Sequence, residues 1–313
     1  YYLVISVHHA QPALPDVRGC ECNCMACSAC DFDNCMTAVA NGDGAVVLED
    51  ISTNCVIVET AVSQILGTDN PDCVLVRGSG VTVGSINTGP GEDCIRVTEG
   101  ATVTGIIFAR EGDDCVRVTQ ATTSRINGGN DADDIIFEGS LVVTMGMPPE
   151  ALNGQNGNDC LKVVPYRGVQ SITGTVFGGN DDDCIDVQNS DVQSISGAEG
   201  NDMLFARCSL MTNMNGGTEN DVLFVSEVTI QPTSTVANFI NGADGDDTIF
   251  VESVTETTLT NGRIQGGGGT NSCCSLVDPA EVNTFNCDND ICPPEVISNC
   301  PRRLNDCFMF MST

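Results

Sequence analysis

Aspartate recurs along the middle of this 313-residue chain at intervals of 19 to 26 residues. The recurring acids are Asp72, Asp93, Asp114, Asp133, Asp159, Asp183, Asp202, Asp221 and Asp247, with Asn54 and Asn271 as imperfect outer copies. Each follows a turn, and glycine stands five residues before the aspartate in seven of the nine repeats. Oxygen-rich sites of this kind suit hard divalent cations. The alternative is that each aspartate only caps its turn by accepting backbone N–H bonds.

Apolar residues keep a fixed distance from every one of these aspartates. The positions two and four residues after the acid are apolar in all nine repeats, as is the position seven residues before it. Apolar side chains at every second position indicate strands with one buried face, and such units bury that face by stacking. The sequence therefore predicts an all-β fold, a parallel β-solenoid (β-helix) of about ten coils. An antiparallel sandwich would not explain the constant phase of the aspartate.

The turn resembles the calcium-binding nonapeptide of RTX proteins, G-G-x-G-x-D-x-U-x with U apolar. The match covers residues 67–75 and eight later equivalents, once per coil. The resemblance implies that turn carbonyls and aspartates of successive coils hold Ca²⁺ between them. Asp131, Asp181 and Glu219 replace glycine two residues before the aspartate and offer further oxygen ligands. The expected metal ligands are these three residues and the nine recurring aspartates, and the expected cofactor is Ca²⁺.

Charge excludes several classes of partner. The formal net charge is −31, from 12 Lys and Arg against 43 Asp and Glu. A polyanion of this size repels nucleic acid and anionic lipid. No apolar run reaches the ~18 residues that a membrane span needs. We therefore expect no nucleic acid, no membrane span, and divalent cations that offset the charge of the turns.

Cysteine usage indicates an oxidising compartment. Six of the 19 cysteines lie between Cys20 and Cys35 and six between Cys273 and Cys307. Disulfides are the expected explanation, in a secreted, extracellular or cell-surface protein. A thiolate metal cluster is the alternative for the first group. The expected organisation is an apolar strand and Cys-rich cap over 1–40, solenoid repeats over 41–272, and a Cys-rich cap over 273–313. Residues 1–10 are either a signal-peptide remnant or an assembly strand.

Two further columns fall on the face opposite the core. Cysteines that follow the aspartate predict disulfides between coils, Cys73–Cys94 and Cys160–Cys184. Phe205, Phe224 and Phe250 form an apolar stripe that needs cover, either from a terminal segment of the same chain or from a partner. Together with the apolar termini, this stripe suggests self-association into a polymer by strand addition.

The residues contain no recognisable catalytic set. The leading hypothesis is a secreted structural or adhesive β-solenoid, stabilised by calcium, that builds an extracellular filament, appendage or surface layer. The alternative is a calcium-dependent β-helical polysaccharide lyase or another carbohydrate-active enzyme. Arg96 and Arg117 would then be the candidate basic groups, although surface pairing with carboxylates is the simpler expectation for both.

Overall fold

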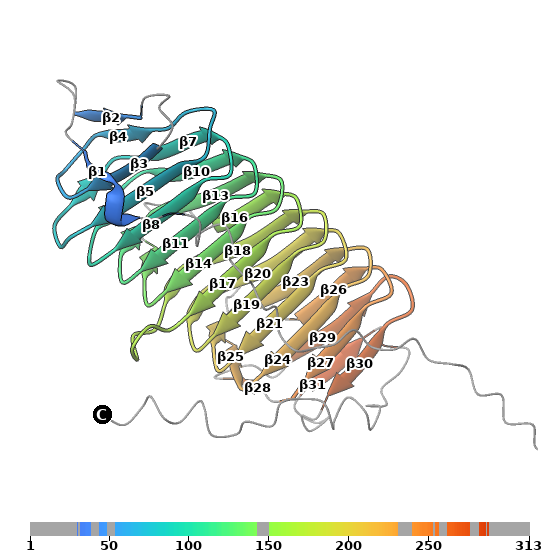
Figure 1. Ribbon diagram of the computed structural model, residues 1–313. Coiled ribbons are helices and arrows are strands. Elements are labelled where there is room, and N and C mark those ends of the chain that lie inside the picture. Colours follow the sequence, from blue (N-terminus) through green and yellow to red (C-terminus); the bar gives the residue numbers. More distant parts are fainter. Residues whose placement is uncertain are drawn as a thin grey trace, which may run out of the picture.

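The computed structural model describes residues 30, 32–38, 44–48, 54–142, 150–230, 240–252, 254–256, 262–275, 282–285 and 287. These residues form an all-β parallel solenoid of about ten coils, as the sequence predicts. Figure 1 shows the coils stacked into an elongated body. One 3-10 turn, η2 (Phe32–Asn34), precedes the first strand. No helix in the described part of the chain has the length and hydrophobicity needed to cross a membrane.

The first sheet contains the strands that begin at or just after the recurring acid. In order along the stack they are β1 (Met36–Thr37), β3 (Asn54–Val58), β5 (Asp72–Arg77), β8 (Cys94–Thr98), β11 (Cys115–Thr119), β14 (Asp134–Glu138), β17 (Cys160–Val164), β19 (Cys184–Gln188), β21 (Met203–Arg207), β24 (Val222–Ser226), β27 (Thr248–Val251) and β30 (Ser272–Ser275). All neighbours are parallel, and each residue pairs with its equivalent one repeat later, for example Val116 with Ile95 and Ile135.

The second sheet contains the strands that lead into the turn and shorter strands that precede them. The leading strands are β2 (Ala45–Val47), β4 (Gln64–Leu66), β7 (Ile86–Pro90), β10 (Ile106–Glu111), β13 (Arg125–Asn130), β16 (Glu150–Asn156), β18 (Ile172–Asn180), β20 (Asp191–Glu199), β23 (Asn213–Thr218), β26 (Ile240–Asp244), β29 (Gly262–Gly267) and β31 (Val282–Phe285). The shorter strands are β6 (Thr82–Val83), β9 (Thr102–Val103), β12 (Thr122–Thr123), β15 (Leu141–Val142), β22 (Leu210–Met211), β25 (Val228–Ile230) and β28 (Val254–Glu256).

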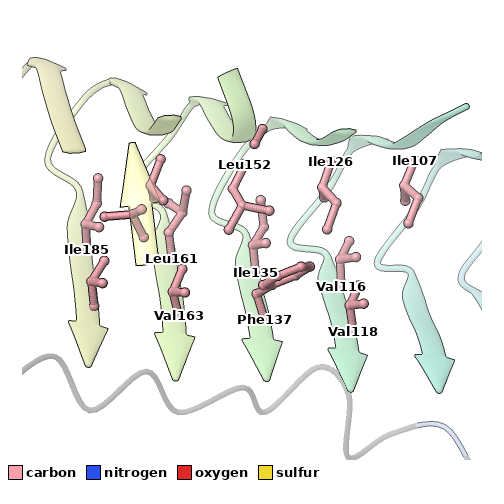
Figure 2. Packing of buried hydrophobic residues seen from close by; sticks show 14 of the residues in the cluster. Ile107, Val116, Val118, Ile126, Ile135, Phe137, Leu152, Leu161, Val163 and Ile185 are labelled. Carbon is pink, nitrogen blue, oxygen red and sulfur yellow. The ribbon is translucent and has the colours of Figure 1, made fainter. Parts of the chain in front are cut away.

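The core lies between the two sheets and consists of the three predicted apolar columns. Ile126, seven residues before Asp133, is fully buried and in register with Ile107 and Leu152. Ile135 and Phe137, two and four residues after that acid, face it from the first sheet (Figure 2). The same three positions are buried in every coil from Asp72 to Asp247. The repeating apolar pattern of the sequence therefore marks the side chains that form the core.

The other face of the first sheet is also covered, which the alternation alone does not predict. Phe205 is fully buried, and Phe224 and Phe250 are 6% and 5% exposed. Their rings contact one another and pack with Cys274 into a second apolar cluster. The three phenylalanines are thus buried within the single chain. Cys274, from the segment expected to form the C-terminal cap, belongs to this cluster.

Disulfides fasten the N-terminal segment onto the first coils. Cys30 bonds to Cys73 and Cys35 to Cys55, with Cα atoms 5.8 and 4.9 Å apart. The predicted Cys73–Cys94 disulfide is therefore wrong. Its physical basis was sound, since Cys73 and Cys94 are paired neighbours on β5 and β8, but a segment distant in sequence reaches Cys73 instead. Cys30 and Cys35 belong to the group that we expected to form a stapled cap rather than a thiolate cluster.

A third disulfide lies near the C-terminal end of the stack. Cys273 bonds to Cys287 at the other end of the stack. Cys160 and Cys184 are both disulfide-bonded, but the expected Cys160–Cys184 pair is not among the disulfides that join two described residues.

The ladder of parallel strands continues through β30 and β31, across the expected boundary at residue 272. Residues 1–10 lie outside the described residues, as does the apolar end of the chain.

Candidate functional site: the aspartate column and its turn

The nine recurring aspartates form a hydrogen-bonded column inside the solenoid. The backbone N–H of each aspartate donates to Oδ1 of the next aspartate along the stack, at 2.7–3.0 Å, and Asp247 donates in the same way to Asn271. All nine carboxyl side chains are at most 2% exposed. The column therefore lies behind the turn, against the core, and its side chains are aligned from coil to coil.

The second carboxyl oxygen lies in a tight backbone pocket. A Cβ added to Gly154 would lie 2.0 Å from Oδ2 of Asp159 and 2.6 Å from the Gly178 carbonyl oxygen, and Gly197 is in the same position relative to Asp202. This close approach is the reason for glycine five residues before the acid. In eight of the nine residues Oδ2 is buried and has no hydrogen-bond partner, namely in Asp93, Asp114, Asp133, Asp159, Asp183, Asp202, Asp221 and Asp247.

The two ends of the column differ from its interior. At the first end, Oδ2 of Asp72 accepts the backbone N–H of Thr68 at 2.7 Å. At the last end, the acid is replaced by Asn271, whose Oδ1 accepts the Asp247 N–H and whose Nδ2 donates to the Gly268 carbonyl at 2.8 Å. The amide occupies the column position with one accepting and one donating atom, and both atoms are satisfied.

Burial raises the pKa of every interior member of the column. The pKa rises to about 7 for Asp93, about 8 for Asp114, about 10 for Asp133, about 8 for Asp159, about 9 for Asp183, about 7 for Asp202, about 8 for Asp221 and about 6 for Asp247. The main cause is loss of hydration. Neighbouring carboxylates raise the pKa further, while the backbone N–H that each Oδ1 accepts opposes the shift.

Mutual repulsion adds to the cost of ionising the column. Neighbouring strands of a parallel ladder are ~4.8 Å apart. Two ionised carboxylates at that spacing repel by about 3 kcal/mol at an effective dielectric constant of 20. Each aspartate from Asp93 to Asp221 has such a neighbour on both sides, whereas Asp247 has Asp221 on one side and the neutral Asn271 on the other. A fully ionised column is therefore unfavourable unless protons or cations neutralise it.

Asp131, Asp181 and Glu219 lie on the exposed outer side of the turn. Their φ angles are 77°, 78° and 71°, in the left-handed region that favours glycine, which most other coils have at this position. Each side chain accepts a backbone N–H from the preceding coil: Asp131 from Gly112, Asp181 from Gly157 and Glu219 from Gly200, at 3.0–3.2 Å. These three acids therefore act as caps between successive turns.

A second, exposed ladder, which we did not predict, runs one residue before the column. Here the bond runs in the opposite direction: the backbone N–H of Asn201 donates to Asp182 of the preceding coil at 2.7 Å, and that of Asp246 donates to Asn220 at 2.8 Å. The backbone and side-chain N–H groups of Asn201, which both donate to Asp182, hold the pKa of Asp182 below its usual value. The polar residue that precedes most of the column acids was the available signal. Neighbouring carboxyl groups, Asp182 and Asp183, thus have opposite pKa shifts.

Side chains alone do not complete the calcium site that the RTX resemblance implies, in which turn carbonyls also supply ligands. Calcium takes six to eight oxygen ligands that converge on one point. The column supplies one buried carboxyl group per coil, with Oδ1 already bound to a backbone N–H. The outer acids point to the other side of the turn, and each accepts an N–H of its own. Among the residues that the structure describes, no three His, Cys, Asp or Glu side chains gather as a metal site would require.

The inward direction of the column could have been derived from the sequence. The apolar positions two and four residues after the acid have the same parity as the acid itself. In a strand, residues of the same parity share one face. Asp72, the first residue of β5, accordingly faces the core together with Val74 and Val76.

The two candidate basic groups occupy neighbouring positions on β8 and β11. Arg117 forms an ion pair with Glu138, with Nη2 3.0 Å from Oε2, and its Nε donates to the same oxygen. The Arg96 guanidinium lies over the Phe32 ring, 5.1 Å from its centroid. The expected surface pairing with a carboxylate is confirmed for Arg117, while Arg96 stacks on the N-terminal segment.

Comparison with protein-family models, with curated proteins and with solved structures finds no match for this chain. The resemblance to the RTX turn therefore stays a prediction.

Proposed function

We propose that this chain is a secreted structural or adhesive subunit, a stiff β-solenoid that builds an extracellular filament, appendage or surface layer. The observation that carries the proposal is the unbroken register of the first sheet from β1 to β30, in which each coil contacts only the next. A stack of this kind resists bending and extension because every coil is bonded to its neighbours by a full strand ladder.

Two observations support the extracellular part of the proposal. Disulfides close both ends of the described stack, Cys35–Cys55 at one end and Cys273–Cys287 at the other. Such bonds are compatible with an oxidising, extracellular location. They also brace the coils that lack a neighbour on one side, which are the weakest part of a repeat array.

Assembly is assigned to the apolar termini. The phenylalanine cluster is buried, so it offers no surface for a partner. The apolar segments Tyr1–Val7 and Phe308–Met311 lie outside the described residues, and their role as strand-adding segments rests on their composition.

Electron microscopy and analytical ultracentrifugation of the full chain over a range of concentrations test assembly. We expect filaments or a concentration-dependent increase in mass. Ile5→Lys and Phe310→Lys should abolish this increase, because a buried charge opposes strand addition. Val169→Lys, at a site that is 49% exposed in the described part of the chain, is the matched control and should assemble as the wild type does. A monomer at every concentration, or assembly unchanged in both terminal variants, contradicts the proposal.

Calcium stabilisation stays a prediction within this proposal. The observation in its favour is the acidity of the exposed turns, and the geometry of the column gives no chelating set. The same assembly experiment with EDTA, and calorimetric titration with CaCl₂, measure whether assembly or stability requires the ion.

A carbohydrate-active enzyme remains the other hypothesis. Depolymerisation assays on acidic polysaccharides, with Arg96→Ala and Arg117→Ala as the discriminating variants, test it. The ion pair of Arg117 with Glu138 and the stacking of Arg96 on Phe32 give both side chains structural roles, so the structural hypothesis is preferred.

A further inference from the structure

Among the residues that the structure describes, no basic side chain is a main electrostatic influence on the interior of the aspartate column. The groups that act electrostatically on the eight interior acids, apart from the other column members, are Asp113, Asp131, Asp134, Asp181, Asp182, Glu219, Asp244 and Asp246. All of them are acids on the turns or on the adjoining strand. The terminal member Asp72 adds a ninth carboxyl group beside Asp93. Every charged neighbour that acts on the column therefore opposes ionisation, whereas the backbone N–H groups and, at Asp93, the Thr88 side chain favour it.

The hydrogen bonds within the column match those of a neutral side chain. Each Oδ1 accepts a backbone N–H, as a carbonyl oxygen does, while each interior Oδ2 is buried against backbone without a donor. Asn271 continues the column with a neutral amide, its oxygen in the accepting role and its nitrogen donating to a backbone carbonyl. A protonated aspartic acid has the same two hydrogen-bonding roles as this amide, with one accepting oxygen and one donating O–H group.

We propose that the interior aspartates Asp93 to Asp247 bind protons when the chain folds, so that the solenoid is held by a column of aspartic acids and not by ionised carboxylates or interposed metal ions. The protons come from solvent and return to it on unfolding. The proposal is independent of assembly and of location, and its failure would leave the proposed structural function untouched.

The sign of the resulting pH dependence follows from linkage. In the unfolded chain these groups titrate near 3.9, whereas burial raises the pKa in the folded chain to between about 6 and about 10. Between those values the folded state binds more protons than the unfolded state, so stability falls as pH rises. The contribution is complete below about pH 4 and is lost as the pH passes the pKa values of the folded state. This is the reverse of the usual behaviour of a salt-bridged aspartate.

Proton counting on the wild-type chain is the direct test. Unfolding at pH 6 should release several protons per chain, measured by potentiometric titration of the folded and the urea-unfolded protein in EDTA. Infrared spectra should show the carbonyl band of protonated carboxyl groups in the folded chain at pH 6, absent after unfolding. Release of no protons, or no such band, overturns the proposal.

A pair of adjacent variants assigns the protons to the column. Asp183→Asn keeps the accepting oxygen but removes one titrating group, so the slope of log K for unfolding against pH should fall by about 1 between pH 5 and pH 7. Asp182→Asn, the same change one residue earlier on the exposed ladder, is the control. Its carboxylate has a lowered pKa, so the slope should not fall.

The effect of Ca²⁺ on the same two proteins distinguishes protons bound to the column from calcium bound to it. Addition of Ca²⁺ should leave the slope difference between Asp183→Asn and the wild type unchanged. If the two slopes agree in EDTA, or if Ca²⁺ stabilises the wild type and not Asp183→Asn, the column does not hold protons. Should Asp183→Asn fail to fold, proton counting on the wild type still decides.

Discussion

At the scale of single residues, neighbouring carboxyl groups in the turn differ in burial and in the direction of their pKa shift. Asp183 is 2% exposed and its pKa rises to about 9, whereas Asp182 is exposed and its pKa falls. Both side chains accept backbone N–H groups from a neighbouring coil. What separates them is access to water, because a carboxylate retains its charge only where hydration or a cation compensates it.

The glycine that stands five residues before seven of the nine column acids gives a prediction at this scale. In Gly197→Ala the new methyl group would lie 2.0 Å from Oδ2 of Asp202, so the side chain or the backbone must move. We expect a loss of about 1–3 kcal/mol in the free energy of unfolding, measured by urea denaturation.

Ala109→Gly is the matched control, because Ala109 occupies the same position before Asp114 and its methyl group is already accommodated. It should cost only about 0.5–1 kcal/mol. If Gly197→Ala were the milder of the two changes, the close approach would not explain the recurring glycine.

At the scale of elements, the first sheet is buried on both faces where it carries β21, β24 and β27. Its inner face packs on the second sheet, and its outer face carries the phenylalanine cluster on β21, β24 and β27. Phe224 stacks on Phe250 with ring centroids 5.1 Å apart and planes inclined by 8°. Parallel strands covered on both faces are expected to be apolar in both parities, as these three strands are.

Phe224→Ala tests whether that cluster contributes to stability. Removing a buried ring leaves a cavity, so we expect a loss of about 3–5 kcal/mol in the free energy of unfolding. Leu141→Ala, at a residue that is 40% exposed, should change the stability by less than about 0.5 kcal/mol. If both substitutions changed the free energy of unfolding by the same small amount, the Phe224 ring would be accessible to solvent.

At the scale of the whole molecule, stability is a sum over coils and their interfaces. Coils in the middle have two neighbours, whereas the first and last have one. The disulfides Cys35–Cys55 and Cys273–Cys287 lie at these two ends. Their expected effect is to prevent the stack from opening at its ends, which exposes strand edges that aggregate.

The double variant Cys35→Ser with Cys55→Ser tests this role. A disulfide that closes a loop of this length contributes about 3 kcal/mol. Hydrogen exchange should show loss of protection in β3 and β5 first, with β24 and β27 retained. The mirror variant, Cys273→Ser with Cys287→Ser, should lose protection at β29 and β30 and retain it at β5. Uniform loss in both variants would mean that the coils unfold as one unit.

The sequence by itself determined the solenoid and its core. The columns of apolar residues around each aspartate are a local pattern repeated in every coil, and stacking is the arrangement that buries such a pattern. The acid also has the same parity as Val74 and Val76, so the sequence contained its inward direction.

Only the tertiary structure decided what covers the outer face of the first sheet and which cysteines bond. Phe224 and Cys73 have the same local context whether a solvent molecule, a partner or a distant segment meets them. The bond from Cys30 to Cys73 joins residues 43 positions apart. The pKa shifts of the column likewise depend on burial and on neighbouring coils, because desolvation and repulsion act through space and not along the chain.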